Sequence, residues 1–431
     1  MRINKLKLSN FRCFETYEME LSERFTLLIG DNGSGKTAIL DAIASVLSDF
    51  LGEFQDRVIP SDLRKLSNND IHYSFSIMGQ NPIKQSNNES LNIQVEVFFN
   101  DKILIHKVSK RLLDFYQPPI LSDTAGYGIT SAETLLPLLV CFSTERLWKK
   151  PNDYEVQTLG PDSRLLGYRD CLNSVLNLER LFRWFKTQEF AALQKKERRH
   201  VLEAVRGAIV SMIPNANTAW WDIDWDELLI ETVIQGEAKT IPFHLLSDGY
   251  RNLIGLAADI AYRMATLNPQ LQTAVIKQTE GIVLIDEIDL HLHPKWQRQV
   301  VGRLLDTFPK VQFVASSHSP FIIQSLYHRE DVLLWDLEKA QAVDITSKSI
   351  EDIAEDQQGV EIPQQSQRFL DMEKAAEEYY SALKQIPIAS EDEKQRLRQR
   401  LDKLLMPYSD DPAFQAFLKM ERLAVEGNGG E

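Results

Sequence analysis

The most informative run of this sequence is Gly30-Asp31-Asn32-Gly33-Ser34-Gly35-Lys36-Thr37. An apolar segment precedes it at 25–29, and a segment with helical periodicity follows at 38–43. Strand, glycine-rich loop and helix form the setting in which G-x-x-x-x-G-K-[ST] binds phosphates. The glycines let backbone N–H groups point at a phosphate chain, Lys36 supplies positive charge, and the Thr37 hydroxyl suits magnesium. The run therefore predicts a nucleoside triphosphate site, with cofactor-binding residues Asn32, Gly33, Ser34, Gly35, Lys36, Thr37 and Ala38.

The bulk composition is that of a globular protein of two or three domains. The chain has 431 residues, of which 43% are hydrophobic and 26% are charged, enough to bury a sizeable core. The net charge of −14 argues against a surface uniformly adapted to nucleic acid, but a local basic patch is compatible with it, so DNA binding stays open.

The cysteines and the apolar runs indicate a cellular compartment. Cys13, Cys141 and Cys171 form no CxxC pair, which favours a reducing cytoplasm. Residues 1–8 alternate polar and apolar instead of forming a signal peptide, and no apolar run approaches the roughly 18 residues of a membrane helix. We therefore expect a cytoplasmic protein without a membrane segment.

The first 170 residues predict strands around the glycine-rich loop. Strands are expected at 2–8, 16–21, 91–99, 102–108 and 136–142, with a helix from Thr37 to about Phe54. The first two strands are predicted to form an edge hairpin, and the polar residues 80–90 a loop tip. Arg12 falls in the turn of the edge hairpin, where it lies either beside the nucleotide or on an exposed turn.

A helical pattern follows from Asp170 to about Ile213. Between its two predicted helices lies the one obvious basic cluster, Lys195-Lys196-Glu197-Arg198-Arg199. Two interpretations stay open for this cluster: a solvated helix surface, or a contact to the phosphates of DNA or RNA.

The second half of the chain supplies acidic groups and a second anion-binding turn. Ser247, Asp248 and Gly249 precede a helix at 252–265, and the N-terminus of a helix can hold an anion. The apolar strand 282–285 ends in Asp286 and Glu287, and we expect it beside the strand that leads into the phosphate loop. There Asp286 would hold magnesium together with Thr37, and Glu287 would act as the general base on the attacking water.

Histidines follow both of the last apolar strands. His318 comes after strand 311–315, where it can contact and sense a γ-phosphate. His291 and His293 lie just after the carboxylates without a third ligand nearby, and we interpret them as part of a loop that links two active sites. The predicted catalytic residues are thus Glu287, Lys36 and His318.

With these motifs in order, the chain resembles the ATP-binding-cassette ATPases of the SMC and RecF type. The resemblance implies an α/β fold: an ABC-type P-loop ATPase head with a mixed β-sheet flanked by helices. It implies lobe I at 1–169, a helical insertion at 170–215, lobe II at 216–345 and a C-terminal helical extension at 346–431. It also implies ATP and Mg²⁺ as cofactors and a head-to-tail dimer, in which Ser247, Asp248 and Gly249 touch the ATP of the partner.

The chain departs from the long-armed members of this class, because residues 37–246 show no sustained heptads. The C-terminal part, with predicted helices at 367–385 and 391–405, is similar to the tails of the stand-alone Septu-type defence ATPases. That resemblance implies homo-oligomers and a small HNH nuclease partner recruited by the extension, with nucleic acid contacted through the complex. The alternatives are a RecF-like DNA repair ATPase and a self-sufficient nuclease, against which the missing metal-carboxylate cluster counts.

Overall fold

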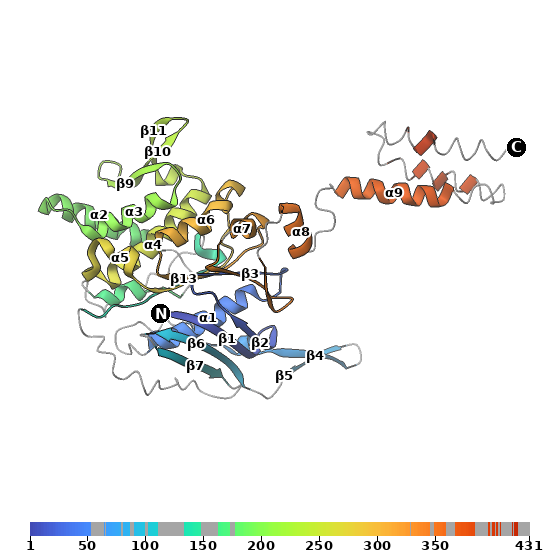
Figure 1. Ribbon diagram of the computed structural model, residues 1–431, viewed down its shortest axis with the longest axis horizontal. Coiled ribbons are helices and arrows are strands. Elements are labelled where there is room, and N and C mark those ends of the chain that lie inside the picture. The colour runs from blue at the N-terminus through green and yellow to red at the C-terminus, as the bar shows by residue number, and fades with distance from the viewer. Residues whose placement is uncertain are drawn as a thin grey trace. The chain divides into compact units, whose positions relative to one another are not determined.

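The computed structural model (Figure 1) describes residues 1–52, 64, 66–78, 81–86, 90–99, 102–110, 133–147, 163–172, 177–327, 329–344, 349–358, 367–383 and scattered positions from 395 to 420. The chain divides into two compact units, Met1–Ile353 and Ala354–Glu431, and each is described by itself. All the residues predicted to bind the nucleotide lie in the first unit.

A six-stranded sheet forms the centre of the first unit. Its strands lie in the order β15, β14, β3, β13, β12 and β8, with the bounds Gln341–Val343, Val332–Asp336, Phe25–Ile29, Val311–Ser316, Gly281–Ile285 and Leu138–Phe142. All neighbours pair in parallel except β15, which is antiparallel to β14. Every residue of β3, β8, β12 and β13 is buried, as is typical of parallel strands covered on both faces.

The acidic strand does not lie beside the strand of the phosphate loop, so that prediction was wrong. β13 pairs with both β3 and β12 and separates them. The sequence could not show this, because all three strands are short, buried and mostly apolar, and such a pattern does not tell which strand pairs with which. Thr37, at the start of the following helix, nevertheless reaches Asp286 at the end of β12.

Helix α1, Lys36–Gly52, follows the phosphate loop directly. It lies between the central sheet and an antiparallel four-stranded sheet (Figure 1). That sheet has the order β2, β1, β6 and β7, with the bounds Phe14–Glu20, Arg2–Phe11, Leu91–Phe99 and Lys102–Lys110. Both predicted hairpins are present, but β1 lies between β2 and β6, so only β2 of the first hairpin is at an edge.

The predicted loop tip at 80–90 contains a strand instead. β4, Tyr73–Met78, pairs antiparallel with β5, Asn81–Ser86. The strand was missed because its sequence, Asn81 to Ser86, has no alternating apolar face, whereas antiparallel pairing satisfies the backbone N–H and C=O groups whatever the side chains are.

Helices cover the opposite face of the central sheet (Figure 1). Helices α2 to α7 have the bounds Leu178–Lys195, His200–Met212, Asp248–Leu267, Val275–Gln278, Pro294–Thr307 and Pro320–Ser325. α4 is buried along most of its length. Its Arg263 is 1% exposed, pairs with Asp259 and donates hydrogen bonds to two carbonyl oxygens. The basic cluster forms the turn between α2 and α3, with Lys195, Lys196 and Arg198 exposed.

A small antiparallel sheet follows α3 in the chain. Its strands β9, β10 and β11 have the bounds Ala216–Asp222, Glu227–Ile234 and Glu237–Pro242. Within the ranges given above, no helix combines the length and the apolar character that crossing a membrane requires.

The second unit has fewer described residues. Helix α8, Ile350–Gln358, runs across the boundary between the units, and α9, Gln367–Leu383, lies within the second. α9 corresponds to the helix predicted at 367–385. The helix predicted at 391–405 lies largely outside the described residues.

Candidate active site

The phosphate loop, the acidic pair and the loop of His318 lie at one edge of the central sheet. β3, β12, β13 and β8 run parallel, so the loops after their last residues emerge on the same side. Ligands of open α/β sheets bind at this edge, outside the carboxyl ends of the strands. The four loops begin at Gly30, Asp286, Ser317 and Ser143.

The glycines of the phosphate loop adopt conformations that other residues avoid. Gly30, Gly33 and Gly35 have φ angles of 140°, 91° and 101°, which are open to glycine without steric cost. Gly35 is also confined from outside, since a Cβ there would lie 2.5 Å from the ring of Phe14 and 2.7 Å from the sulfur of Cys13. The turn between β1 and β2 thus fixes the base of the loop.

Lys36 lies inside the phosphate loop. Its Nζ donates to the carbonyl oxygens of Gly30 and Asp31 at 2.7 and 2.8 Å. Burial lowers the pKa of Lys36, while the nearby carboxylates, Asp286 first, oppose that shift. The ammonium group is therefore held by these two carbonyl oxygens and, at 3.5 Å, by Ser34 Oγ, all neutral acceptors, in a partly desolvated place, where a phosphate oxygen would be a stronger partner.

Thr37 and Asp286 form the pair of oxygens expected for magnesium. Thr37 Oγ1 donates to Asp286 Oδ2 at 2.9 Å, and Ser316 Oγ donates to Asp286 Oδ1 at 2.5 Å. Adjacent ligands of an octahedral Mg²⁺, each about 2.05 Å from the ion, are about 2.9 Å apart. Hydroxyl and carboxylate oxygens are also the hard ligands that Mg²⁺ prefers, so these two residues fit the ion.

No group of three or more His, Cys, Asp or Glu side chains within the described ranges is arranged to hold a metal ion. A magnesium ion that accompanies a nucleotide needs no such group, because it takes one or two protein oxygens and completes its shell with water and phosphate oxygens.

Glu287 adopts an uncommon backbone conformation. Its φ is 48°, in the left-handed region that non-glycine residues rarely occupy. Its N–H donates to Ser316 Oγ at 2.8 Å, and its carbonyl oxygen accepts from Arg146 at 2.9 Å. The N–H and C=O of Glu287 are thus hydrogen-bonded to the last residue of β13 and to the short helix after β8, which holds the residue in place.

Arg12 lies in a cluster of charges beside α1. Its guanidinium pairs with Asp41 at 2.6 Å and with Asp70 at 2.9 Å, and Arg64 also pairs with Asp41 at 2.6 Å. Burial lowers the pKa of Arg12, but the two carboxylates outweigh it and raise the pKa. Arg12 is therefore an ion-paired, partly buried residue and not a free turn arginine; a contact to the nucleotide stays a prediction.

The predicted signature residues begin α4. Ser247 is the exposed N-cap of this 20-residue helix, and its side chain makes no capping hydrogen bond. Asp248 pairs with Arg251 at 2.7 Å. Among the described residues, the polar contacts of 247–249 stay on α4, so the structure does not bring them to the phosphate loop of the same chain.

His318 lies between two anchored serines in the loop after β13. It is exposed, while Ser317 donates to Asp289 and Ser319 donates to Gln297. The loop thereby presents the imidazole at the same sheet edge as Asp286 and Glu287. Its role as a γ-phosphate sensor stays a prediction.

Two family profiles match the chain. One, described as an AAA ATPase domain, covers residues 1–155, and the other, an AAA domain whose description also names the AbiEii toxin of type IV toxin–antitoxin systems, covers residues 172–324. The "Retron Vc95 probable ATPase" of Vibrio cholerae is 28% identical over 376 residues, which are 76% of this chain and 72% of the relative.

The chain is a P-loop ATPase, similar in both halves to AAA ATPase domains. The predicted enzyme class, an ATPase, is thereby confirmed, and the largely parallel sheet flanked by helices agrees with the predicted α/β fold class. The "Septu protein PtuA" of Bacillus mycoides is 27% identical over 359 residues, which are 80% of this ATPase and 42% of that protein. The solved SMC head domain from Thermotoga maritima is 16% identical, covers 78% of this ATPase and 94% of that chain, and has a TM-score of 0.41.

One residue of the ATPase site escaped the sequence analysis. Arg146 lies in the short helix η3, Thr144–Leu147, directly after β8, and is 1% exposed. It donates to the carbonyl oxygens of Asp286 and Glu287 at 2.7 and 2.9 Å. An arginine after a strand resembles any loop arginine in sequence, and carbonyl partners give no residue-type signal.

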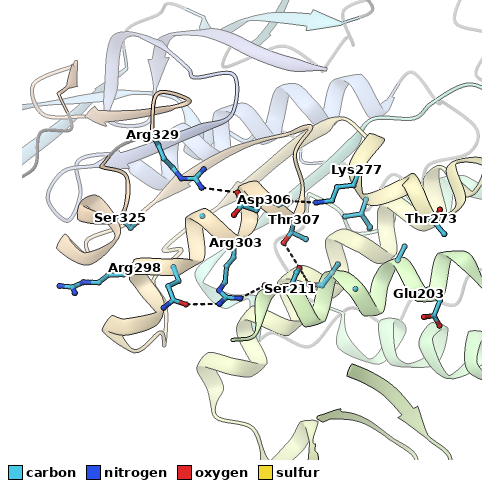
Figure 2. Close-up of a pocket in the computed structure, with 16 residues that line it drawn as sticks. Glu203, Ser211, Thr273, Lys277, Arg298, Arg303, Asp306, Thr307, Ser325 and Arg329 are labelled. Carbon is cyan, nitrogen blue, oxygen red and sulfur yellow. Dashed lines mark hydrogen bonds and ion pairs between the residues drawn. The ribbon is translucent and has the colours of Figure 1, made fainter. Parts of the chain in front are cut away.

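The ATPase also has an open pocket of about 820 Å³ that none of the predicted site residues lines. Figure 2 shows it between α3, α6 and the segment around Lys277. At its floor Ser211 and Thr307 share a hydrogen bond of 2.8 Å, and Arg303 donates to the carbonyl oxygen of Ser211. The pocket therefore lies where α3, a helix of the predicted insertion, is hydrogen-bonded to α6.

Proposed function

We propose that this ATPase is the cytoplasmic, ATP-hydrolysing subunit of a Septu-like anti-phage defence complex, which regulates an associated HNH nuclease through ATP-dependent dimerisation of its head. The observation that carries the defence assignment is the similarity, over three quarters or more of the chain, to a retron ATPase and to a Septu protein.

Different residues of the chain have separate roles in ATP hydrolysis. Backbone N–H groups of residues 32–38 and the Lys36 ammonium bind the phosphates of ATP. Thr37 and Asp286 hold a magnesium ion, which when bound neutralises charge on the phosphate oxygens. Glu287 accepts a proton from the attacking water, and His318 contacts the γ-phosphate from the neighbouring loop.

A second copy of the chain completes the site. Ser247 begins a long helix, lacks a side-chain capping bond and is exposed, so its N-terminus is available to an anion. In a head-to-tail dimer, Ser247, Asp248 and Gly249 of one subunit contact the γ-phosphate in the other. ATP then stabilises the closed dimer through contacts that exist only in that state, and hydrolysis releases it.

Two further surfaces are assigned to partners. The extension at 346–431 recruits the nuclease, and nucleic acid is contacted through the assembled complex. The exposed basic turn between α2 and α3 is the proposed place of phosphate contacts in that complex; its exposed lysines fit such contacts as they fit a solvated helix surface.

The test is purification of the tagged chain from its own operon, with and without ATP, followed by native mass measurement and a nuclease assay. A small nuclease that co-purifies in a fixed ratio, and whose cutting changes with ATP, supports the proposal. A chain that arrives alone, dimerises with ATP and binds duplex DNA overturns it in favour of a RecF-like repair ATPase.

A further inference from the structure

A buried arginine ties together three parts of the site that the sequence motifs treat as separate. Arg146 is one of the two largest side chains that the described residues bury almost completely, and it has no carboxylate among its hydrogen-bond acceptors. A buried cation whose acceptors are neutral is costly. Stability alone therefore does not explain why an arginine is buried at position 146.

The first set of contacts reaches the carboxylate loop. The two terminal nitrogens of Arg146 donate to the carbonyl oxygens of Asp286 and Glu287. These bonds fix the peptide groups on either side of the Glu287 Cα. Together with the bond from Glu287 N–H to Ser316, they hold Glu287 at a φ of 48°, a conformation that costs about 1 kcal/mol or more for a residue with a Cβ.

The second contact reaches the signature helix. Arg146 Nε donates to Asn252 Oδ1 at 2.8 Å, and Asn252 Nδ2 donates to the carbonyl oxygen of Leu290 at 2.9 Å. Asn252 lies on α4, five residues after Ser247, and is 2% exposed. The start of α4, Arg146 and residues 286–290 therefore form one hydrogen-bonded unit.

We infer that Arg146 is a positioning residue for ATP hydrolysis: it fixes the backbone of Glu287, and through Asn252 it links that backbone to the helix that begins at Ser247. This inference rests on the proposed role of Glu287 as general base. When Ser247 contacts the nucleotide of the partner and α4 moves, Asn252 and Arg146 transmit that movement to Glu287 of the same chain. Arg146 itself touches neither ATP nor the water.

The side chain has the chemistry for this task. Burial lowers the pKa of Arg146 to about 10, while the fields of Asp286, Glu287 and Asp289 oppose that shift, so the guanidinium is charged at neutral pH. Its planar fork can serve several acceptors at fixed angles, whereas a lysine ammonium at the same place is a single point on a flexible stem.

The experiment compares Arg146→Lys with Arg263→Lys. Arg263 is also 1% exposed and also donates to two carbonyl oxygens. It lies near the end of α4, at the opposite end of the helix from Ser247, and none of its hydrogen bonds goes to Asp286 or Glu287. Arg146→Lys is expected to lower kcat about 100-fold and to leave the Kd for ATP within about threefold. Arg263→Lys is expected to lower the melting temperature and leave kcat at 25 °C unchanged. Should Arg146→Lys fail to fold, Arg146→Gln, which keeps one donor group, is measured in its place.

A double-mutant cycle separates positioning from general damage. If Arg146 acts through Glu287, adding Arg146→Lys to Glu287→Gln lowers the residual single-turnover rate no further, whereas independent effects multiply. Multiplying effects, or an unchanged kcat in Arg146→Lys, overturn the inference. A Glu287→Gln variant that hydrolyses ATP normally instead removes the proposed general base, and this inference with it.

Discussion

The Cα of Gly249 lies against the carbonyl oxygen of His291, so closely that a Cβ on Gly249 would come within 2.6 Å of that oxygen. Real Cβ atoms do not approach an oxygen so closely, and backbone cannot swing away as the end of a side chain can. The first turn of α4 thus packs directly on the loop that follows Asp286 and Glu287. A side chain at position 249 would therefore clash with the same chain, which explains why this position of the predicted signature is a glycine.

Gly249→Ala is expected to lower the ATPase rate by about 10- to 100-fold, because residues 289–292 must shift and a displacement of the order of 1 Å in an active site has effects of that size. The matched control is Gly207→Ala. Gly207 is inside α3, and a Cβ there meets nothing within 4 Å. The control is expected to gain about 1 kcal/mol in stability from helix propensity. Steady-state kinetics measures the ATPase rates of both variants, and thermal melts measure their stability. Equal rates in the two variants would contradict the steric argument.

Lys36→Ala is expected to weaken ATP binding about 10- to 100-fold, since hydrogen bonds to charged groups contribute about 1.5–3 kcal/mol. Titration with a fluorescent ATP analogue measures the Kd. Lys310→Ala serves as control, because Lys310 is an exposed lysine paired with Glu280. Similar affinities for the two variants would show that Lys36 does not contact the phosphates.

The site could be predicted from sequence where the chemistry is local. The phosphate loop carries its own glycines, and an apolar strand that ends in two acids needs no partner to be recognised. The 2.9 Å contact between Thr37 and Asp286, residues 249 positions apart, follows once both motifs are placed at the same sheet edge.

Pairing and backbone-directed contacts could not be predicted in this way. β3, β12 and β13 are all buried and mostly apolar, so their sequences do not determine the order of strands in the sheet, which depends on packing across the whole unit. Arg146 and Asn252 reach carbonyl oxygens, and every residue has one. Side chains that act on backbone therefore leave no spacing or residue type to search for.

Asp70→Asn is expected to remove a pH-dependent part of the stability. Burial alone would raise the pKa of the Asp70 carboxyl, but hydrogen bonds from Ser67 and the ion pair with Arg12 lower it below 3.8. Because the folded pKa lies below the unfolded one, ionised Asp70 stabilises the fold above about pH 4, and this contribution is lost as the pH falls through the folded pKa.

Urea unfolding at pH 6 and pH 3 measures this effect. The variant should be less stable than the wild type at pH 6, and the difference between the two midpoints should be smaller at pH 3. Asp226→Asn, which breaks an exposed pair with Lys186, should change little at either pH. A difference between wild type and Asp70→Asn that is the same at both pH values would rule out ionisation as its cause.

Asp286→Asn is expected to raise the Mg²⁺ concentration for half-maximal ATPase activity at least about tenfold. The amide keeps an oxygen near Thr37 but loses the charge, and even changes to groups behind a metal ligand cost about 10- to 100-fold in affinity. Ser316→Ala is the graded control, since it removes a hydrogen bond to Asp286 and one from the Glu287 N–H but keeps the Asp286 carboxylate; its kcat can fall, but its shift in the Mg²⁺ concentration for half-maximal activity should be smaller. A magnesium dependence identical to wild type in Asp286→Asn would remove Asp286 from the metal site.

Glu287→Gln is expected to bind ATP, to hydrolyse it at least about 100-fold more slowly, and to accumulate as a closed dimer. Light scattering after size exclusion, with and without ATP, measures the dimer. Adding Ser247→Arg to this variant should abolish ATP-driven dimerisation, because the large side chain occupies the position where the partner's γ-phosphate belongs. Thr240→Arg is the control, since Thr240 is equally exposed, on β11. If the Ser247→Arg protein still dimerises with ATP as the Thr240→Arg protein does, the two heads do not meet through the start of α4, and the completion of each site by its partner is wrong.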